Sequence, residues 1–249
     1  MKSAAGLGLF LILFSFTSMA ADLMPGSSID INGGAAIMST SLTGTGFAAD
    51  TSGTTGLSYG GNLGYAWSKG SCLHFKYSES GAQFSPPATI SPSKIKATQS
   101  EFTFYGIFQP FEDSGAKNLR FGLGYTQLIY AVDSNSPAII TTQRSQGLDL
   151  LVENDFDIND KYNMTAMGLL YLPHQFAESD SHTGFNPKYL GIEGGLRFNW
   201  NTREDLKTYL ALVYRLDQVS FEGTGNRGVT GGTDTRTTIK ILAGVNFEL

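Results

Sequence analysis

The sequence is short of several residue types, and each shortage limits what the protein can be. It has one cysteine, Cys72, among its 249 residues, so an internal disulfide framework and a cysteine-based zinc cluster are excluded. Charged residues make up 16% of the chain and the net charge is −5, which argues against a nucleic-acid binder. After the first twenty residues, no stretch approaches the roughly 18 apolar residues of a membrane-spanning helix. Glycine, with 30 residues, and aromatic residues, at 12%, are abundant instead.

The N-terminal segment has the pattern of a secretory signal peptide. Lys2 supplies a positive charge, residues 7–16 are apolar, and Ser18 and Ala20 form a small-x-small cleavage site. We expect residues 1–20 to be removed after Ala20 and residues 21–249 to form one domain. The pattern predicts export, which leaves the periplasm, the outer membrane or the medium as the destination.

The stretch that begins at Thr237 and ends at Leu249 alternates strictly between two kinds of residue. One row is apolar and the other is polar except for Leu242, which is the period of a strand with one oily and one wet face. The apolar row is Ile239, Ile241, Ala243, Val245, Phe247 and Leu249. The polar row is Thr238, Lys240, Gly244, Asn246 and Glu248. This stretch resembles the final strand of bacterial outer-membrane β-barrels, although those most often end in phenylalanine.

Similar alternating segments recur about every twenty residues along the rest of the chain. We count ten, near residues 28–39, 56–67, 72–84, 98–109, 119–132, 143–158, 162–176, 188–200, 207–222 and 235–249. These lengths suit tilted membrane strands, which need about nine to eleven residues within the bilayer. The segments predict an all-β fold: a closed, antiparallel, up-and-down transmembrane β-barrel of about ten strands, with eight or twelve as alternatives.

The connections between these segments fall into two sets. Residues 68–71, 159–161 and 201–206 are short and turn-like, and 111–118 is a longer member of that set. Residues 40–55, 85–97, 133–142, 177–187 and 223–234 are long and rich in Ser, Thr, Gly and Pro. Short turns at one end and long loops at the other are typical of outer-membrane barrels. The resemblance therefore implies periplasmic termini and loops outside the cell.

The oily faces carry aromatic residues close to the short turns. We predict an interfacial aromatic girdle, since such rings gather where a barrel leaves the hydrocarbon layer. Its members are Trp67, Phe156, Tyr162, Trp200, Tyr209 and Phe247.

The wet faces carry charges of both signs, which in a narrow barrel must pair within the lumen. The predicted ion-pair network consists of Glu101, Arg120, Asp149, Glu153, Glu193, Arg197, Arg215, Asp217 and Lys240, with Lys76 on the same faces. If the turn 201–206 closes a tight hairpin, Glu193 lies opposite Arg215. Neighbouring glycines are expected to make room for the long basic side chains.

Motifs for chemistry are weak. The segment 223–228 has G-x-G-x-x-G spacing, but a strand is expected after it where a phosphate site needs a helix. His74, His174 and His182 lack a ligand partner at metal spacing, so we predict no metal and no cofactor. Asp180 and His182 resemble the Asp-x-His pair of the omptin surface proteases. A matching Asp-x-Asp element is missing, and Asp50 is the nearest other acid considered.

Three functions remain open. The first is a structural or surface-interaction barrel that acts through its long extracellular loops, around a narrow lumen filled with charges. The second is a narrow, porin-like channel for small solutes or ions, and the third is an outer-rim hydrolase of the omptin type. We expect the first, with no enzymatic activity and no nucleic-acid partner. The implied location is the outer membrane of a Gram-negative bacterium, among lipid and lipopolysaccharide. The implied assembly partner is the barrel-assembly machinery, which would bind the strand from Thr237 to Leu249.

Overall fold

The computed structural model describes residues 26–68, 70–85, 94–111, 118–133, 140–179 and 182–249. The predicted signal peptide, residues 1–20, lies outside this part of the chain. Strands account for nearly all of the regular structure described. They are β1 (Ser27–Gly44), β2 (Phe47–Thr54), β3 (Gly56–Ser68), β4 (Ser71–Phe84), β5 (Ile95–Phe108), β6 (Leu119–Val132), β7 (Gln143–Asn159), β8 (Tyr162–Tyr171), β9 (Gln175–Glu178), β10 (Phe185–Asn201), β11 (Leu206–Glu222) and β12 (Thr233–Glu248).

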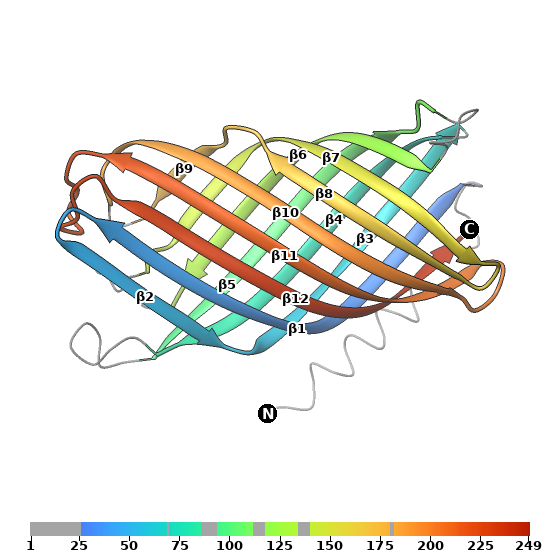
Figure 1. Ribbon diagram of the computed structural model, residues 1–249, viewed down its shortest axis with the longest axis horizontal. Coiled ribbons are helices and arrows are strands. Elements are labelled where there is room, and N and C mark those ends of the chain that lie inside the picture. The colour runs from blue at the N-terminus through green and yellow to red at the C-terminus, as the bar shows by residue number, and fades with distance from the viewer. Residues whose placement is uncertain (1–25, 69, 86–93, 112–117, 134–139, 180–181) are drawn as a thin grey trace.

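All twelve strands belong to one antiparallel sheet that closes on itself (Figure 1). The first and last strands seal the ring, with pairs running from Ser28↔Glu248 to Thr43↔Thr233. β2 and β3 pair with successive parts of β1, and β8 and β9 pair with successive parts of β7. β2 and β3 together act as one interrupted strand, and so do β8 and β9. The twelve described segments therefore occupy ten strand positions around the barrel. The prediction of a closed barrel of about ten strands is confirmed.

The two ends of the barrel differ. At one end, where β1 begins and β12 ends, tight connections join β7 to β8 and β10 to β11; we call this the turn end (Figure 1). Leu249 is bonded there to the start of β1, since its N–H donates to the Ser27 carbonyl at 2.9 Å. The opposite end carries the longer connections, among them the one between β11 and β12, and we call it the loop end.

One predicted loop is wrong. Residues 40–55 were expected to be irregular, but β1 runs to Gly44, Thr45 and Gly46 make the turn, and β2 returns. Gly46 has a φ of 71°, which a residue without a β-carbon adopts easily. The threonine-rich composition that suggested a loop is equally suited to a paired strand.

The barrel wall has an apolar outer face. Large side chains predicted for the oily rows are exposed, including Leu123, Leu196, Leu210 and Leu212, each about half exposed. A continuous apolar surface of this kind would be unfavourable in water and is suited to lipid. Within the described ranges, no helix is long and apolar enough to cross a membrane.

The lumen is filled on the side of β1 to β6 towards the loop end. Buried side chains there pack into an apolar cluster, which we call the loop-end core. It consists of Met38, Ala49, Ala82, Phe84, Ile95, Ala97, Tyr130 and Ile140. Side chains that interlock in this way leave little room for water, because protein interiors pack as densely as organic crystals.

Candidate functional site

A cluster of ionised side chains occupies the middle of the lumen, with Arg215 of β11 at its centre. The Arg215 side chain is fully buried. Its guanidinium donates to Glu101 of β5 at 3.0 Å, to Tyr171 of β8 at 2.8 Å and to Asp217 at 2.9 Å. It also lies over the Tyr171 ring, 4.2 Å from the centroid. One side chain therefore ties three strands together across the barrel.

Five further charges belong to this group, which we call the central ion cluster: Glu101, Asp217, Glu193, Lys76 and Lys240. The Lys76 Nζ lies 3.5 Å from both Glu101 and Glu193, so it bridges two acids of distant strands. Lys240 is buried and its Nζ lies 3.4 Å from the Ser78 hydroxyl. With Arg215, the cluster holds three cations and three anions. This balance is what low-dielectric burial of charges requires.

The predicted hairpin register is confirmed. Glu193 of β10 lies directly opposite Arg215 of β11, and their charged atoms are 3.8 Å apart. This separation is longer than the 2.9 Å of the Arg215–Asp217 contact, and Glu193 also contacts Lys76.

Asp149 lies on the loop-end side of this cluster and binds a histidine that the sequence reasoning left without a partner. His174 Nε2 is 2.9 Å from an Asp149 carboxylate oxygen, and both side chains are buried. The imidazole stacks on Tyr189 with ring centroids 4.9 Å apart, and Tyr189 donates to Asp217. Gly147 leaves room for the ring, since a β-carbon there would lie 2.3 Å from His174 Cδ2.

Towards the turn end, the predicted charges separate into two smaller groups. Arg120 of β6 contacts Glu153 at 3.4 Å and Asp155 at 2.9 Å. On the other side of the lumen, Arg197 of β10 contacts Asp30 of β1 at 3.3 Å. Asp30 and Asp155 were missed as lumen residues, although their positions follow from the alternation of their strands.

Tyr209 was predicted to belong to the outer girdle, and that prediction is wrong. The side chain is buried in the lumen, where its hydroxyl donates to Asp30 at 2.6 Å and Arg197 lies 5.0 Å from its ring centroid. Its odd number places it on the same face of β11 as Arg215, so a strict period of two would have assigned it inward. Gly244 of β12 accommodates the ring, because a β-carbon there would lie 2.4 Å from Tyr209 Cζ.

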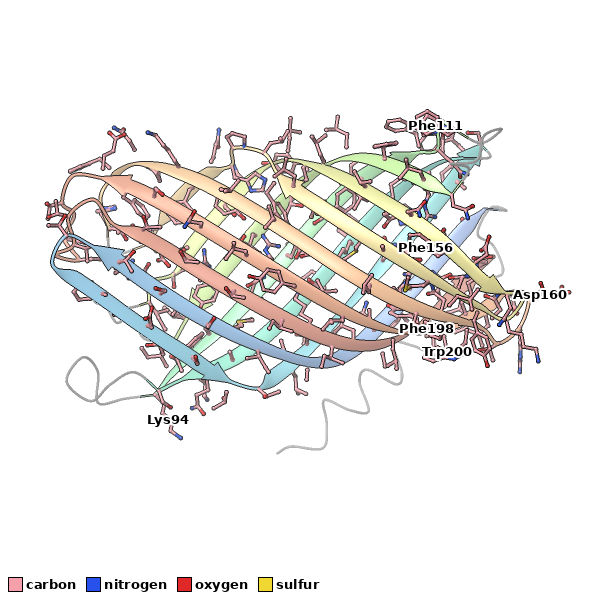
Figure 2. All side chains as sticks on the ribbon, viewed as in Figure 1. Lys94, Phe111, Phe156, Asp160, Phe198 and Trp200 are labelled. Carbon is pink, nitrogen blue, oxygen red and sulfur yellow. The ribbon has the colours of Figure 1, made fainter. Side chains whose placement is uncertain are left out.

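The other predicted girdle residues belong to the outward-facing rows of their strands, and Figure 2 shows Phe156 and Trp200 near the turn end. Trp67 and Phe156 are about half exposed, and Tyr162, Trp200 and Phe247 are partly buried against neighbouring strands. Phe198 joins them: its ring lies 6.0 Å from that of Tyr162 and 5.2 Å from that of Trp200.

The turn half of the lumen is hollow. A cavity of about 480 Å³ is lined by residues of the turn end, including Arg120, Arg197 and Lys207. A second cavity of about 220 Å³ lies deeper and reaches Lys76 and Glu193 of the central ion cluster. We call the two together the vestibule. Past it, the central ion cluster and the loop-end core fill the lumen.

The loop end holds another polar group, which the sequence analysis did not predict. Arg227, from the connection between β11 and β12, is buried and contacts Glu178 at 3.2 Å and Asp234 at 3.4 Å. Gln143 donates to the same Asp234 carboxylate at 2.7 Å. The connecting segment is thereby folded back into the barrel mouth. The only hint in the sequence was a basic residue in a glycine-rich segment, and that pattern does not show whether the side chain points into the barrel or out of it.

Of the residues considered for chemistry at the rim, Asp50 and His182 are not brought together. Asp180 lies outside the described residues. Asp50 is exposed on β2, and β1, β12 and β11 separate that strand from β10, next to which His182 lies. A strand, β12, follows the segment 223–228, as expected for a loop that is not a phosphate site. Among the described residues, no group of three or more His, Cys, Asp or Glu side chains is arranged to hold a metal ion.

Comparison with known proteins agrees with the barrel geometry. The structure resembles that of the outer membrane protease OmpT from Escherichia coli, with a TM-score of 0.62, over 90% of this chain and 96% of that one. The chain has an outer-membrane β-barrel fold. The sequence identity to OmpT is 11%, so the likeness extends to the fold alone. The outer membrane protein OprG from Pseudomonas aeruginosa also matches, at 14% identity and a TM-score of 0.41, over 90% of this chain and 97% of that one. No protein-family model matches the sequence, and neither does any curated protein.

Proposed function

We propose that the protein is an integral outer-membrane barrel with a closed lumen, which acts through the surface it presents outside the cell. The observation that carries this proposal is the filling of the lumen. The fully buried Arg215 joins β11 to β5 and β8 at mid-barrel, and the loop-end core packs beyond it. Side chains locked in this way do not provide a water path, and the working surface is then the loop end.

The orientation follows from the same proposal. The turn end faces the periplasm and the loop end faces outward, as in other barrels with short turns at one end. Three cations point outward from the loop-end parts of their strands: Lys96 of β5, Arg144 of β7 and Lys188 of β10. Cations at that height suit the phosphate groups of lipopolysaccharide, and the apolar band below them suits lipid. The strand β12 is the proposed contact for the assembly machinery. The proposal includes no catalytic turnover.

A loop-exchange experiment tests the surface role. Residues 223–226 and 228–232 are replaced by glycine and serine, while Arg227 is kept because it pairs with Glu178 and Asp234 inside the barrel mouth. The variant is compared with Arg197→Gln, which alters the vestibule only. Each variant is expressed in a strain that lacks the protein. We expect Arg197→Gln to correct the defect caused by the loss of the protein, and we expect the loop-exchange variant not to correct it. Restoration by the loop exchange, with failure of Arg197→Gln, would move the function into the lumen. Heat-dependent gel mobility confirms that both variants fold.

The vestibule favours a second candidate, a narrow channel. Its two cavities reach inward from the turn end and are lined by charges of both signs, as a path for small ions would be. Conduction would require Arg215 to leave Glu101 and the loop-end core to open. Swelling of proteoliposomes in small sugars, with a general porin as positive control, distinguishes the two, since a closed barrel gives no swelling.

A further inference from the structure

The single cysteine of the chain lies beside a histidine and an asparagine in the vestibule. Cys72 and His74 both point inward from β4, since alternate residues of a strand share a face. The Cys72 Sγ is 3.2 Å from His74 Nε2, and His74 Nδ1 is 2.6 Å from the Asn62 side-chain nitrogen on β3. Gly64 is paired with His74 and leaves room for the ring, because a β-carbon there would lie 3.2 Å from His74 Cε1.

The thiol can be reached by a small molecule. Cys72 is partly buried, and both cavities of the vestibule are lined by Cys72 and His74. The outer cavity, at about 480 Å³, is within the size range of pockets that hold small ligands. Cys72 packs in part against a cluster of buried side chains inside the barrel.

Asn62 contacts the imidazole nitrogen that points away from the thiol. The Asn62 side-chain oxygen is buried without a hydrogen-bond partner among the described residues. As the amide stands, its nitrogen faces His74 Nδ1. A 180° rotation would bring the oxygen there, so that Nδ1–H would donate to Asn62 and Nε2 would be free to accept the thiol proton. A thiol, a base and a residue that orients the base form the usual arrangement of an activated nucleophile.

We propose that Cys72 is a reactive thiol that captures low-molecular-mass disulfides entering the vestibule from the turn end. His74 Nε2 takes the Cys72 proton while the sulfur attacks one sulfur of the disulfide. A Cys72–S–S–R bond forms, the original S–S bond breaks, and the leaving thiolate receives the proton from His74. Cys72 is oxidised to a mixed disulfide, and the departing sulfur is reduced to a thiol.

Disulfide exchange needs less from the site than acyl transfer does. It requires a base and open space in line with the S–S bond, whereas acyl transfer also requires donors for an oxyanion. Because the chain has one cysteine, no second thiol within it can displace the captured group. The adduct therefore persists until an external thiol removes it, and the reaction is a stoichiometric capture.

The reaction of the refolded full chain with the disulfide reagent DTNB tests the proposal. Native protein should release one equivalent of thiolate, and Cys72→Ser should release none. His74→Gln should react about 100-fold more slowly at neutral pH, as expected for loss of a general base. Its rate should then rise steadily with pH, because only the ionised thiol reacts. His182→Gln, on the exposed loop end, is the matched control and should react like the native protein.

Asn62→Ala provides a second variant that keeps both sulfur and imidazole, and it should slow the reaction about tenfold with the native pH profile lost. Folding of each variant is checked by gel mobility with and without heating. Unchanged rates in folded His74→Gln and Asn62→Ala would overturn the proposal. So would a native thiol that reacts only after the barrel is unfolded.

Discussion

At the scale of single residues, glycine inside the barrel makes room for rings. The sequence suggested that these glycines accommodate long basic side chains. Instead, a β-carbon on Gly124 would lie 2.2 Å from the ring of Tyr105, and one on Gly244 would lie 2.4 Å from that of Tyr209. In each case the glycine and the ring belong to neighbouring strands. A flat ring can lie over the bare backbone, and its hydroxyl then reaches the charges beyond.

The Gly244→Val substitution tests this role of glycine. The added side chain must displace Tyr209, whose hydroxyl then loses Asp30, so we expect a loss of about 1–3 kcal/mol in the free energy of unfolding. Urea unfolding of the protein refolded in lipid vesicles measures it. Gly168→Val is the matched control, because a β-carbon there meets nothing within 4 Å. Equal stability of the two variants would contradict the ring-accommodation account.

Arg215 is the residue on which the central ion cluster depends most. Arg215→Met leaves Glu101, Glu193 and Asp217 with too few cations in a buried site. We expect the free energy of unfolding to fall by about 3–5 kcal/mol, as when one partner of a buried ion pair is removed. Urea unfolding measures it, with Arg203→Met in the exposed turn before β11 as the control. A decrease in the free energy of unfolding of less than about 1 kcal/mol would contradict this account, because that is the contribution of an ordinary surface ion pair.

At the scale of elements, alternation predicts the strands well and their ends less well. The segment 119–132 coincides with β6, and the segment 207–222 differs from β11 by one residue. Residues 40–44 were not predicted as strand, because the part of a strand that extends beyond the lipid-facing band has no row of apolar residues to indicate it. The interruption between β8 and β9 falls at Pro173, which cannot donate to the ladder.

Substitutions on the outer face of β11 can show which part of the strand lies in the hydrocarbon layer of the membrane. Leu212 and Ser220 both point outward, but Leu212 lies near the middle of the strand and Ser220 near the loop end. We expect Leu212→Arg to cost about 2–4 kcal/mol and Ser220→Arg about 0–1 kcal/mol, as for cations at the bilayer centre and at its edge. Unfolding in lipid vesicles measures both. Similar costs at the two positions would contradict the assigned hydrocarbon band.

At the scale of the whole molecule, the sequence predicts a closed barrel and a charged lumen, but not how the lumen is filled. Register within one hairpin could be worked out, as the pairing of Glu193 with Arg215 shows. Contacts across the lumen could not be worked out from the sequence, because they depend on how the ten strand positions curve around the barrel. The Arg215–Glu101 contact and the inward position of Arg227 are of that kind. The Cys72–His74 contact needed only adjacent positions on one face, and the sequence reasoning considered each residue alone.

The lumen filling has one direct electrical consequence. Single-channel conductance of the refolded mature chain in a planar bilayer measures it, with heat-dependent gel mobility as evidence of folding. Because the loop-end core and the central ion cluster fill the lumen, we expect no measurable conductance at any salt concentration. A steady conductance proportional to salt, from protein shown to be folded, would contradict a closed lumen and identify the vestibule as the entrance to a channel.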